Sequence, residues 1–385
     1  MKSEECRSCG SKALTLVYDF GPQPLAGYFP TRPDSEVPAN RYALDLTQCR
    51  TCGLLQVTNL PPIEDVFHAD YRYSSSTVPD LVRHFEGYAE YLAARLPAGA
   101  SVLEFGCNDG VLLERLARRG FDCTGVDASD NVASLARAKG LDVRTGFLTE
   151  AFVAEQNLTG RFDAVTCSNV FAHIDDLRGT MAAVRALLKP GGVFFVEVHD
   201  GDVLAREAQF DTIYHEHLTY FTASTLRRLT EAEGFAFAAC ERTPMHGGGL
   251  RFSATLRAAG AAATAPESVA LIDGAAFAET IRRCREDLAR LQAEHGPLYG
   301  YGAAGRSQMF INMAGGEGRF AAVFDDSAFR QDRYIVGTDI PIRSYSGERG
   351  GCCVILAWNY APTIAARVAG SFDKVVTLLP DYREW

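Results

Sequence analysis

The chain has 385 residues, of which 47% are hydrophobic, and a formal net charge of -10 at pH 7. This length supplies apolar material for two or three hydrophobic cores, so we expect a multidomain globular protein. The acidic balance, without a basic stripe, argues against nucleic acid as a partner. The sequence shows neither a signal peptide nor an apolar run long enough to span a bilayer, which predicts a cytoplasmic protein with no membrane partner.

Two pairs of cysteines form the first candidate site along the chain. Cys6 and Cys9 lie in "CRSCG", and Cys49 and Cys52 lie in "CRTCG". Each C-x2-C-G turn presents two thiolates, and two such turns complete a tetrahedral zinc site, so we favour zinc over free thiols or disulfides. Four thiolates leave no open position, which indicates a structural metal. We predict a zinc-binding domain over residues 1–78.

A strand, turn, helix and second strand follow a helix expected from about Pro79 to Leu96. The stretch is "SVLEFGCNDGVLLERLARRGFDCTGVDAS", and its second strand ends at Asp127. Its first loop has the pattern E-x-G-x-x-x-G, which differs from the G-x-G-x-x-G that binds a pyrophosphate. Glycines let a nucleoside lie close to the backbone, and a carboxylate at the second strand end can hold both ribose hydroxyls. A dinucleotide therefore fits this loop badly.

This pattern resembles class I S-adenosylmethionine-dependent methyltransferases. Later segments repeat it, with strands in "FDAVTCSNVFAHI" and "VFFVEV" around a helix that is stopped by Pro190. We expect a doubly wound parallel sheet over residues 79–258, with ligands beyond the carboxyl ends of its strands. His173 would lie at that edge. The resemblance implies a cofactor site for S-adenosylmethionine formed by Glu104, Gly106, Asn108, Gly110, Asp127 and Asn169.

The segment "TIYHEHLTYF" places two histidines and a carboxylate between two tyrosines. His215 and His217 are two residues apart, whereas a metalloprotease helix needs a spacing of four. On a strand or an extended loop both would point to one side and Glu216 to the other. Three adjacent titratable groups suggest an acid/base site, and the alternative is a polar turn whose histidines bond to the backbone.

The last part of the chain, residues 259–385, begins with the Ala-rich linker "AGAAATAPES" and a charged helix that runs to about His295. A G-x-G-x-x-G motif follows at Gly300, Gly302 and Gly305, with Asp325 at the distance of a ribose-binding acid. By itself this motif predicts NAD binding. About ninety residues are short for a whole dinucleotide fold, so we favour a Rossmann-like lobe that packs against the chain and is a candidate to hold a substrate nucleotide.

Several features point to one family, namely the zinc module, "EFGCNDG", "SNVFAHI", "FDTIYHEHLTYF", "HGGGLRF", "YGAAGRSQMF", "VGTDIPI" and "LAWNY". Taken together, they resemble the three-domain sugar C-methyltransferases of bacterial deoxysugar pathways. The resemblance implies methyl transfer to C3 of a nucleotide-linked 4-keto-6-deoxy sugar, with His217 as the general base. It places four further residues around the sugar, namely Tyr73, His173, Tyr214 and Glu216. The chain departs from the family at Gly249, where H-G-G-S-L-R is common.

The expected fold class is thus α/β: a central class I methyltransferase sheet with an amino-terminal four-cysteine zinc domain and a carboxyl-terminal Rossmann-like lobe. Two other functions stay open at this point. A dehydrogenase would use the loop from Gly300 to Gly305. A non-catalytic zinc- and nucleotide-binding protein would leave "YHEH" without a purpose. The sequence leaves the oligomeric state open, with a monomer as one candidate.

Overall fold

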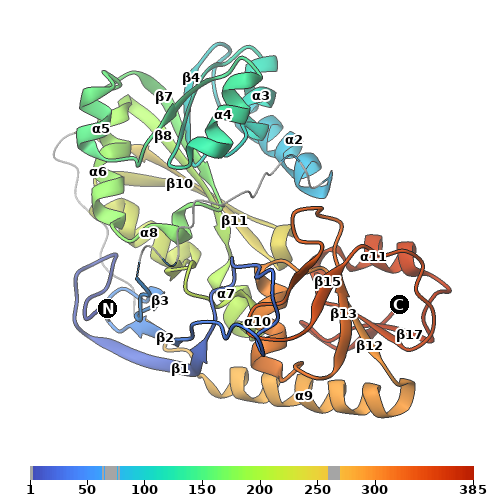
Figure 1. The fold of residues 1–385 in the computed structure, drawn as a ribbon. Helices are drawn as coiled ribbons and strands as arrows, with labels where there is room; N and C mark the ends of the chain where they lie inside the picture. The colour runs from blue at the N-terminus through green and yellow to red at the C-terminus, as the bar shows by residue number, and fades with distance from the viewer. Residues whose placement is uncertain (1–2, 63–64, 66–75, 77–78, 259–268) are drawn as a thin grey trace.

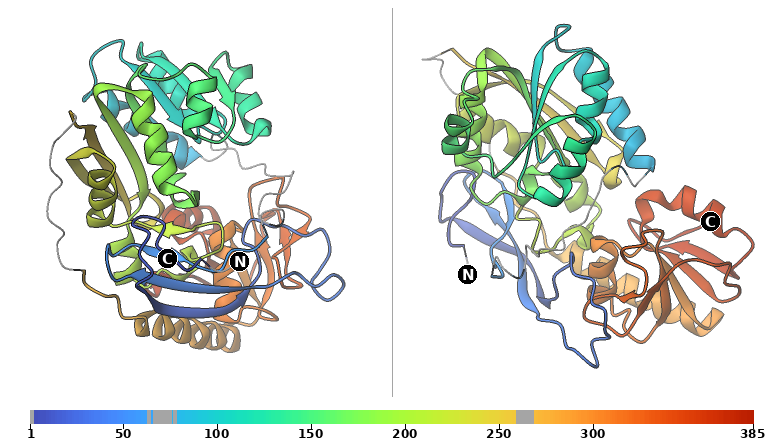
Figure 2. Two further views of the ribbon diagram at one scale, coloured as in Figure 1. Left: turned by 90° about the vertical axis from the view of Figure 1, so that its left-hand side faces the viewer. Right: turned by 45° about the horizontal axis from the view of Figure 1, so that its top comes forward.

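Three β-sheets form the framework of the chain (Figure 1). The computed structural model describes residues 3–62, 65, 76, 79–258 and 269–385. Figure 2 shows the methyltransferase-like part above the amino-terminal and carboxyl-terminal parts, which lie next to each other.

The central sheet has seven strands. In spatial order they are β10 (Phe235–Thr243), β11 (Gly249–Leu256), β8 (Leu188–His199), β7 (Phe162–Ser168), β4 (Ser101–Phe105), β5 (Asp122–Asp127) and β6 (Asp142–Thr145). The five strands from β8 to β6 are parallel, and β11 runs antiparallel to both β8 and β10. Apolar runs without alternation form these inner strands because both faces of the sheet are covered.

Helices cover the central sheet on both faces, as expected for a doubly wound fold (Figure 1). They are α2 (Pro79–Ala93), α3 (Val111–Arg118), α4 (Asp130–Ala138), α5 (Glu150–Glu155), α6 (Leu177–Leu187) and α8 (Ala223–Ala232). Helix α7 (Gly201–Arg206) packs elsewhere, with Leu204 in the same core as Leu44 and Phe310. One core lies between α2, α3 and the sheet, and another between α6, α8 and the opposite face. The predicted helix after Pro79 and the predicted βαβ unit are confirmed.

The amino-terminal sheet contains a strand from the middle of the chain. Its order is β1 (Leu14–Gln23), β2 (Tyr42–Cys49), β3 (Leu55–Val57) and β9 (Thr219–Tyr220). Strand β9 is part of "TIYHEHLTYF" and pairs with β3, with Leu55 opposite Tyr220. The zinc domain therefore aligns the histidine-rich segment.

The carboxyl-terminal part is a second doubly wound unit. Its strands in spatial order are β14 (Arg333–Tyr334), β15 (Pro341–Arg343), β13 (Phe320–Phe324), β12 (Leu298–Tyr301), β16 (Cys352–Ile355), β17 (Lys374–Thr377) and β18 (Arg383–Glu384). Its helices are α9 (Ala275–His295), α10 (Gly305–Ala314) and α11 (Ala361–Val368). Cys352 and Cys353 of β16 are fully buried.

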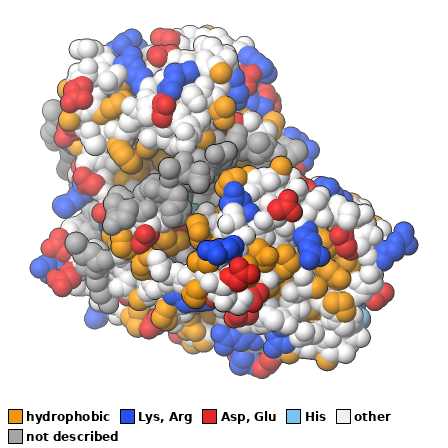
Figure 3. Space-filling model, viewed as in Figure 1, with side chains coloured by type: hydrophobic (Ala, Val, Ile, Leu, Met, Phe, Trp, Pro, Cys, Tyr) orange, Lys and Arg blue, Asp and Glu red, His pale blue; other side chains and the backbone are white. Residues whose placement is uncertain are grey.

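One hydrophobic core joins all three parts. It contains Leu44 and Leu46 of β2, Phe210 just before the histidine-rich segment, Ile213 within that segment, and Phe310 of α10. Because these side chains exclude water together, the parts support one another. Figure 3 shows acidic and basic side chains mixed over the surface of this face. None of the helices in the described ranges combines the length and the apolar character that crossing a bilayer requires.

Candidate functional site

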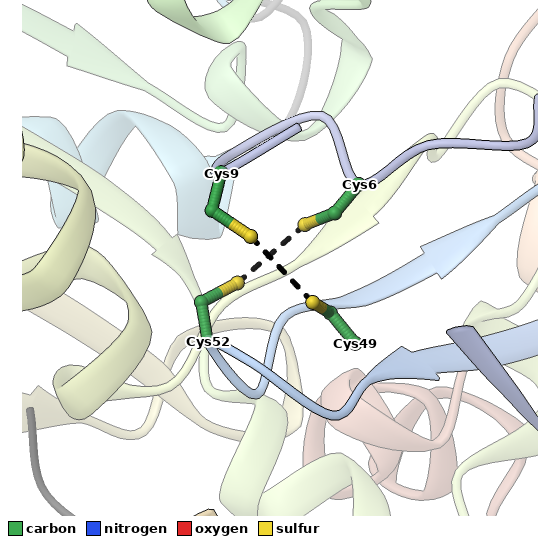
Figure 4. A group of neighbouring side chains, drawn as sticks. All are labelled: Cys6, Cys9, Cys49 and Cys52. Atoms are coloured by element: carbon green, nitrogen blue, oxygen red, sulfur yellow. Dashed lines mark hydrogen bonds between the residues drawn. The ribbon is translucent and has the colours of Figure 1, made fainter. Parts of the chain in front are cut away.

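The four cysteines predicted to bind zinc converge (Figure 4). The Sγ atoms of Cys6 and Cys52 are 3.5 Å apart, and those of Cys9 and Cys49 are 3.6 Å apart. All four lie within 4.8 Å of one another. Sulfurs about 2.3 Å from a tetrahedral zinc ion would be about 3.8 Å apart, so the group has the size of a zinc site. Four thiolates make this metal structural.

The first loop of the central sheet has the backbone of a nucleoside site. It follows β4, and three of its residues, Gly106, Asn108 and Gly110, have positive φ angles of 64°, 51° and 77°. A Cβ atom added to Gly106 would lie 2.2 Å from Val170, so only glycine fits there. Asp127 at the end of β5 accepts hydrogen bonds from the backbone N–H of Asn108 at 2.8 Å and of Ser129 at 2.9 Å. These bonds tie the two strand ends together.

Two carboxyl groups give this loop its electrostatic character. Glu104 is 3% exposed, and its Oε2 has no hydrogen-bond partner among the described residues. Burial, followed by the nearby charge of Asp127, raises the pKa of Glu104 well above its usual value. Burial also raises the pKa of Asp127. A buried acceptor without a partner is costly, so the loop fits a ligand such as S-adenosylmethionine, which carries N–H and O–H donors and positive charge.

The predicted cofactor residues on the sheet lie at adjacent strand ends. Strands β7, β4 and β5 are neighbours, and Asn169, Gly106 and Asp127 follow or end them. Asn169 has a positive φ of 55°, and its N–H bonds to the carbonyl oxygen of Glu197 at 2.8 Å. The structure thus brings the predicted cofactor residues together. Their contact with the cofactor stays a prediction.

His217 is held in a defined tautomer. Its Nδ1 lies 3.1 Å from the carbonyl oxygen of Thr212, which can only accept, so Nδ1 carries the proton. Nε2 therefore has the lone pair and accepts from the hydroxyl of Tyr214 at 2.8 Å. Desolvation is the main cause of a His217 pKa well below its ordinary value, and the charge of His173 lowers this pKa further. The imidazole is neutral near pH 7 and able to accept a proton.

The expectation that His215 and His217 share a side is wrong. Residues 214–217 form a turn, closed by a bond from the His217 N–H to the Tyr214 carbonyl at 3.0 Å, so the alternation of an extended chain does not apply. His215 is 1% exposed and its Nε2 donates to the carbonyl of Ala43 in the zinc domain at 3.2 Å. This bond attaches the turn to the zinc domain.

Glu216 and His173 are both connected to this turn. Oε1 of Glu216 accepts from the N–H of Gly27 at 2.9 Å, which attaches the turn to the segment "GPQPLAGYFP". Nδ1 of His173 donates to the carbonyl of Glu216 at 2.6 Å, and the rings of His173 and His217 are 4.9 Å apart. Tyr73, which the resemblance places beside the sugar, lies outside the described residues.

A small cavity of about 30 Å³ is lined by residues of both predicted sites. Its lining includes Asn169 from the cofactor side and His217 from the histidine-rich turn. His199, at the end of β8, lines the same cavity. Neither ring nitrogen of His199 has a hydrogen-bond partner among the described residues, and burial lowers its pKa to about 3. His199 was not among the predicted site residues, although a polar residue directly after "VFFVEV" is the same strand-end signal that indicated Asn169.

The second glycine motif is covered by protein. Gly305 begins α10, and Ala26 of the zinc domain lies 3.4 Å from the position of an added Cβ. Gln308, one turn later, donates to the carbonyl of Ala26 at 2.9 Å. Arg330 contacts both carboxylate oxygens of Asp325 at 3.2 Å. Because a pyrophosphate would need the helix end that Ala26 covers, the NAD hypothesis does not fit this lobe.

The fold and the first loop together define a class I S-adenosylmethionine-dependent methyltransferase. Family descriptions agree over most of the chain: a zinc binding domain over residues 6–67, a methyltransferase domain over residues 82–239 and a C-methyltransferase C-terminal domain over residues 244–379.

Known proteins make the assignment more specific. The chain is 32% identical to C-methyltransferase NovU of Streptomyces niveus, over 94% of this chain and 91% of the relative. It is 40% identical over 113 residues to a ubiquinone biosynthesis O-methyltransferase of Xanthomonas axonopodis pv. citri, which covers 28% of this chain and 46% of that protein.

Among solved structures, the PH0226 protein from Pyrococcus horikoshii OT3 has a TM-score of 0.42 at 18% identity, covering 50% of this chain and all of that one. The magnesium protoporphyrin IX methyltransferase of Synechocystis PCC 6803 with bound SAH has a TM-score of 0.38 at 18% identity, covering 46% of this chain and 83% of that chain. On the end-to-end match to NovU, the chain belongs to this family of zinc-containing C-methyltransferases. It is an S-adenosylmethionine-dependent enzyme that methylates carbon.

Proposed function

We propose that the enzyme methylates C3 of a nucleotide-linked 4-keto-6-deoxy sugar through an enolate, with His217 as the general base. The observation that carries the base assignment is the fixed tautomer of His217. Its proton-free Nε2 belongs to a ring that lines the same cavity as Asn169 of the cofactor site. The sugar class is supported by the resemblance of the whole set of motifs to sugar C-methyltransferases.

The chemistry explains why a base is needed. A carbon beside a ketone becomes nucleophilic only when a proton leaves it, and the resulting enolate oxygen needs hydrogen-bond donors. In the proposed step Nε2 of His217 takes the proton from C3, the electron pair forms the bond to the methyl group, and the ketone is restored. When bound, S-adenosylmethionine would supply the methyl group as an electrophile; its methyl–sulfur bond would break and S-adenosylhomocysteine would be the leaving group.

Four side chains are candidates to assist His217. The hydroxyl of Tyr214 already donates to Nε2, and it can move its hydrogen bond to the enolate oxygen when substrate arrives. His199, whose ring nitrogens have no partner among the described residues, offers a second donor, a ring N–H. Glu216 and His173 are proposed to hold the turn around His217, because their contacts attach it to the segment around Gly27 and to the end of β7.

The proposal is tested with full-length, zinc-loaded enzyme, methyl-labelled S-adenosylmethionine and a panel of nucleotide-linked 4-keto-6-deoxy sugars. We expect the label on carbon, and deuterium uptake at C3 in heavy water followed by NMR. His217→Asn should lose roughly 10²- to 10⁴-fold in turnover and in deuterium uptake, the range for a removed general base, with unchanged cofactor affinity.

The matched control is His215→Asn, the same substitution two residues away on a ring that bonds to Ala43. It should keep turnover within about tenfold, because it removes no group from the cavity. Rapid deuterium uptake by His217→Asn would remove the base role from His217. A methyl group on oxygen in the wild-type product would overturn the proposed reaction.

A further inference from the structure

The carboxyl-terminal domain contacts the segment just before the histidine-rich turn (residues 214–217) through Arg306, the residue after Gly305 in the second glycine motif. Its guanidinium donates to both oxygens of Asp211, from Nε at 2.9 Å and from Nη2 at 3.1 Å. Trp358 of "LAWNY" donates from Nε1 to the same carboxylate at 3.0 Å, and its ring lies 4.6 Å from the guanidinium carbon. Asp211 is 1% exposed, so these three donors satisfy a buried charge.

Asp211 lies in the short 3-10 helix η3 (Phe210–Thr212), which precedes the histidine-rich turn. Phe210 stacks on Phe310 of α10 at 5.7 Å, so the same helix that presents Arg306 also packs under η3. The carbonyl of Thr212, one residue after Asp211, accepts the proton on Nδ1 of His217. A continuous path of contacts therefore runs from α10 to the imidazole.

The same side chains hold a second loop of the methyltransferase domain. Nη1 of Arg306 donates to the carbonyl of His246 at 2.7 Å. A Cβ atom added to Gly247 would lie 2.1 Å from the Trp358 ring, so this glycine lets the ring approach the backbone. The loop is the one that contains "HGGG". The positive charge of Arg306 also favours the neutral form of His217, as a smaller contribution than burial.

We propose that Arg306 and Trp358 are positioning residues for methyl transfer: by fixing Asp211 they orient the Thr212 carbonyl, and this carbonyl sets the tautomer and the orientation of His217. The inference rests on the proposed role of His217. It also gives a purpose to "YGAAGRSQMF" and "LAWNY", two of the motifs that carry the family resemblance.

The test uses Arg306→Lys, which keeps the charge but loses the two-pronged contact with Asp211. Its control is Arg330→Lys, because Arg330 also contacts both oxygens of one carboxylate, that of Asp325 in the same domain, and the two arginine side chains are 18% and 20% exposed. Trp358→Phe removes a single N–H donor and keeps a ring, so it should fold if the lysine variant does not.

The first measurement needs no substrate. Histidine-selective ¹⁵N NMR of the full chain, with the His217 signal identified by its loss in His217→Asn, reports which ring nitrogen carries the proton. We expect a single Nδ1–H tautomer in wild type and in Arg330→Lys, and a mixture in Arg306→Lys and Trp358→Phe. This result would stand even if no keto-sugar were turned over. It therefore tests the positioning role of Arg306 and Trp358 independently of the proposed reaction.

The second measurement is turnover of whichever sugar nucleotide the wild type methylates. Arg306→Lys should lower kcat by roughly 10- to 100-fold, as expected for a displaced catalytic group, with KM and cofactor affinity within about twofold. Trp358→Phe should lower kcat less. An unchanged His217 tautomer and an unchanged kcat in a folded Arg306→Lys or Trp358→Phe would overturn the inference, as would an equal loss in Arg330→Lys.

Discussion

At Gly106 and at Gly302 the chain makes the same turn. The N–H of Gly106 bonds to the carbonyl of Val126, and that of Gly302 to the carbonyl of Phe324, both at 2.7 Å. Each turn continues with a bond from a loop N–H to an acid at the carboxyl end of the next strand. This acid is Asp127, the last residue of β5, in the first turn and Asp325, the residue after β13, in the second. Each acid also accepts from the N–H two residues later. The backbone frame is shared.

The surroundings of the two turns differ. Glu104 places a buried carboxyl group two residues before Gly106, whereas the equivalent position before Gly302 is Gly300, where an added Cβ would lie 2.7 Å from Leu356. The second turn is closed by Ala26 and by the guanidinium on Asp325. The turn at Gly302, which matches the dinucleotide pattern, thus packs against the zinc domain. The turn at Gly106, which departs from that pattern, has a buried carboxyl oxygen of Glu104 without a hydrogen-bond partner among the described residues, as a cofactor site would.

The largest expected contrast is in cofactor affinity. Asp127→Asn should weaken S-adenosylmethionine binding by about 1.5 to 3 kcal/mol, or roughly 10- to 150-fold, because a charged acceptor is lost. Asp325→Asn makes the same change in the second turn and should leave the affinity unchanged. Calorimetric titration of both variants measures this. Equal losses of cofactor affinity in the two variants would show that the two turns do not differ in cofactor binding.

The stabilisation that a bound ligand gives tests the same difference between the turns at Gly106 and Gly302 without any mutation. S-adenosylmethionine at 100 times its Kd should add about 2.7 kcal/mol to the free energy of unfolding, whereas NAD at the same concentration should add nothing. The melting temperature of the full chain with each ligand is the measurement. A shift with NAD that Asp325→Asn abolishes would show that the second turn binds nucleotide.

The docking role of the second motif predicts a loss of stability. Gln308→Leu removes the bond to Ala26 and the bond accepted from the Val336 N–H at 3.0 Å, and should lower the free energy of unfolding by about 1 to 3 kcal/mol at constant cofactor affinity. Gln292→Leu is the control, because among the described residues the Gln292 side chain bonds within its own domain, where it accepts from Arg319 at 3.0 Å. Denaturant unfolding of both variants should show the difference, and equal stability would contradict a docking role.

The smallest expected effect is the release of a fraction of a proton when the cofactor binds. Because burial and Asp127 raise the pKa of Glu104, part of its population keeps a proton above the usual range. A cationic cofactor favours the ionised form, so binding should release up to one proton per cofactor in the pH window between the bound and the free pKa. Calorimetry at neutral pH in buffers of different ionisation enthalpy measures this release. The proton release should disappear in Glu104→Gln. Proton uptake on cofactor binding would contradict the prediction.

Much of the architecture follows from local pattern. Two C-x2-C-G turns have few uses other than a metal site, and the spacing of Cys6, Cys9, Cys49 and Cys52 fixed the prediction that the structure confirms. Strand, glycine turn and amphipathic helix are likewise short-range features, so the elements between Ser101 and Asp127 were predictable. The family resemblance added the reaction class, which spacing by itself does not provide.

Long-range contacts decided the rest. Whether a glycine turn faces a ligand or a neighbouring domain depends on residues such as Ala26, which lies almost three hundred positions before Gly305 in the sequence. The pairing of β9 with the zinc-domain strand β3 and the turn that separates His215 from His217 were also invisible in the sequence. The sequence determined which groups the chain carries and which local backbone shapes it adopts. Only tertiary packing decided which of those groups lost their partners to burial and which were covered, because the cost of burying a polar atom is set by everything that surrounds it.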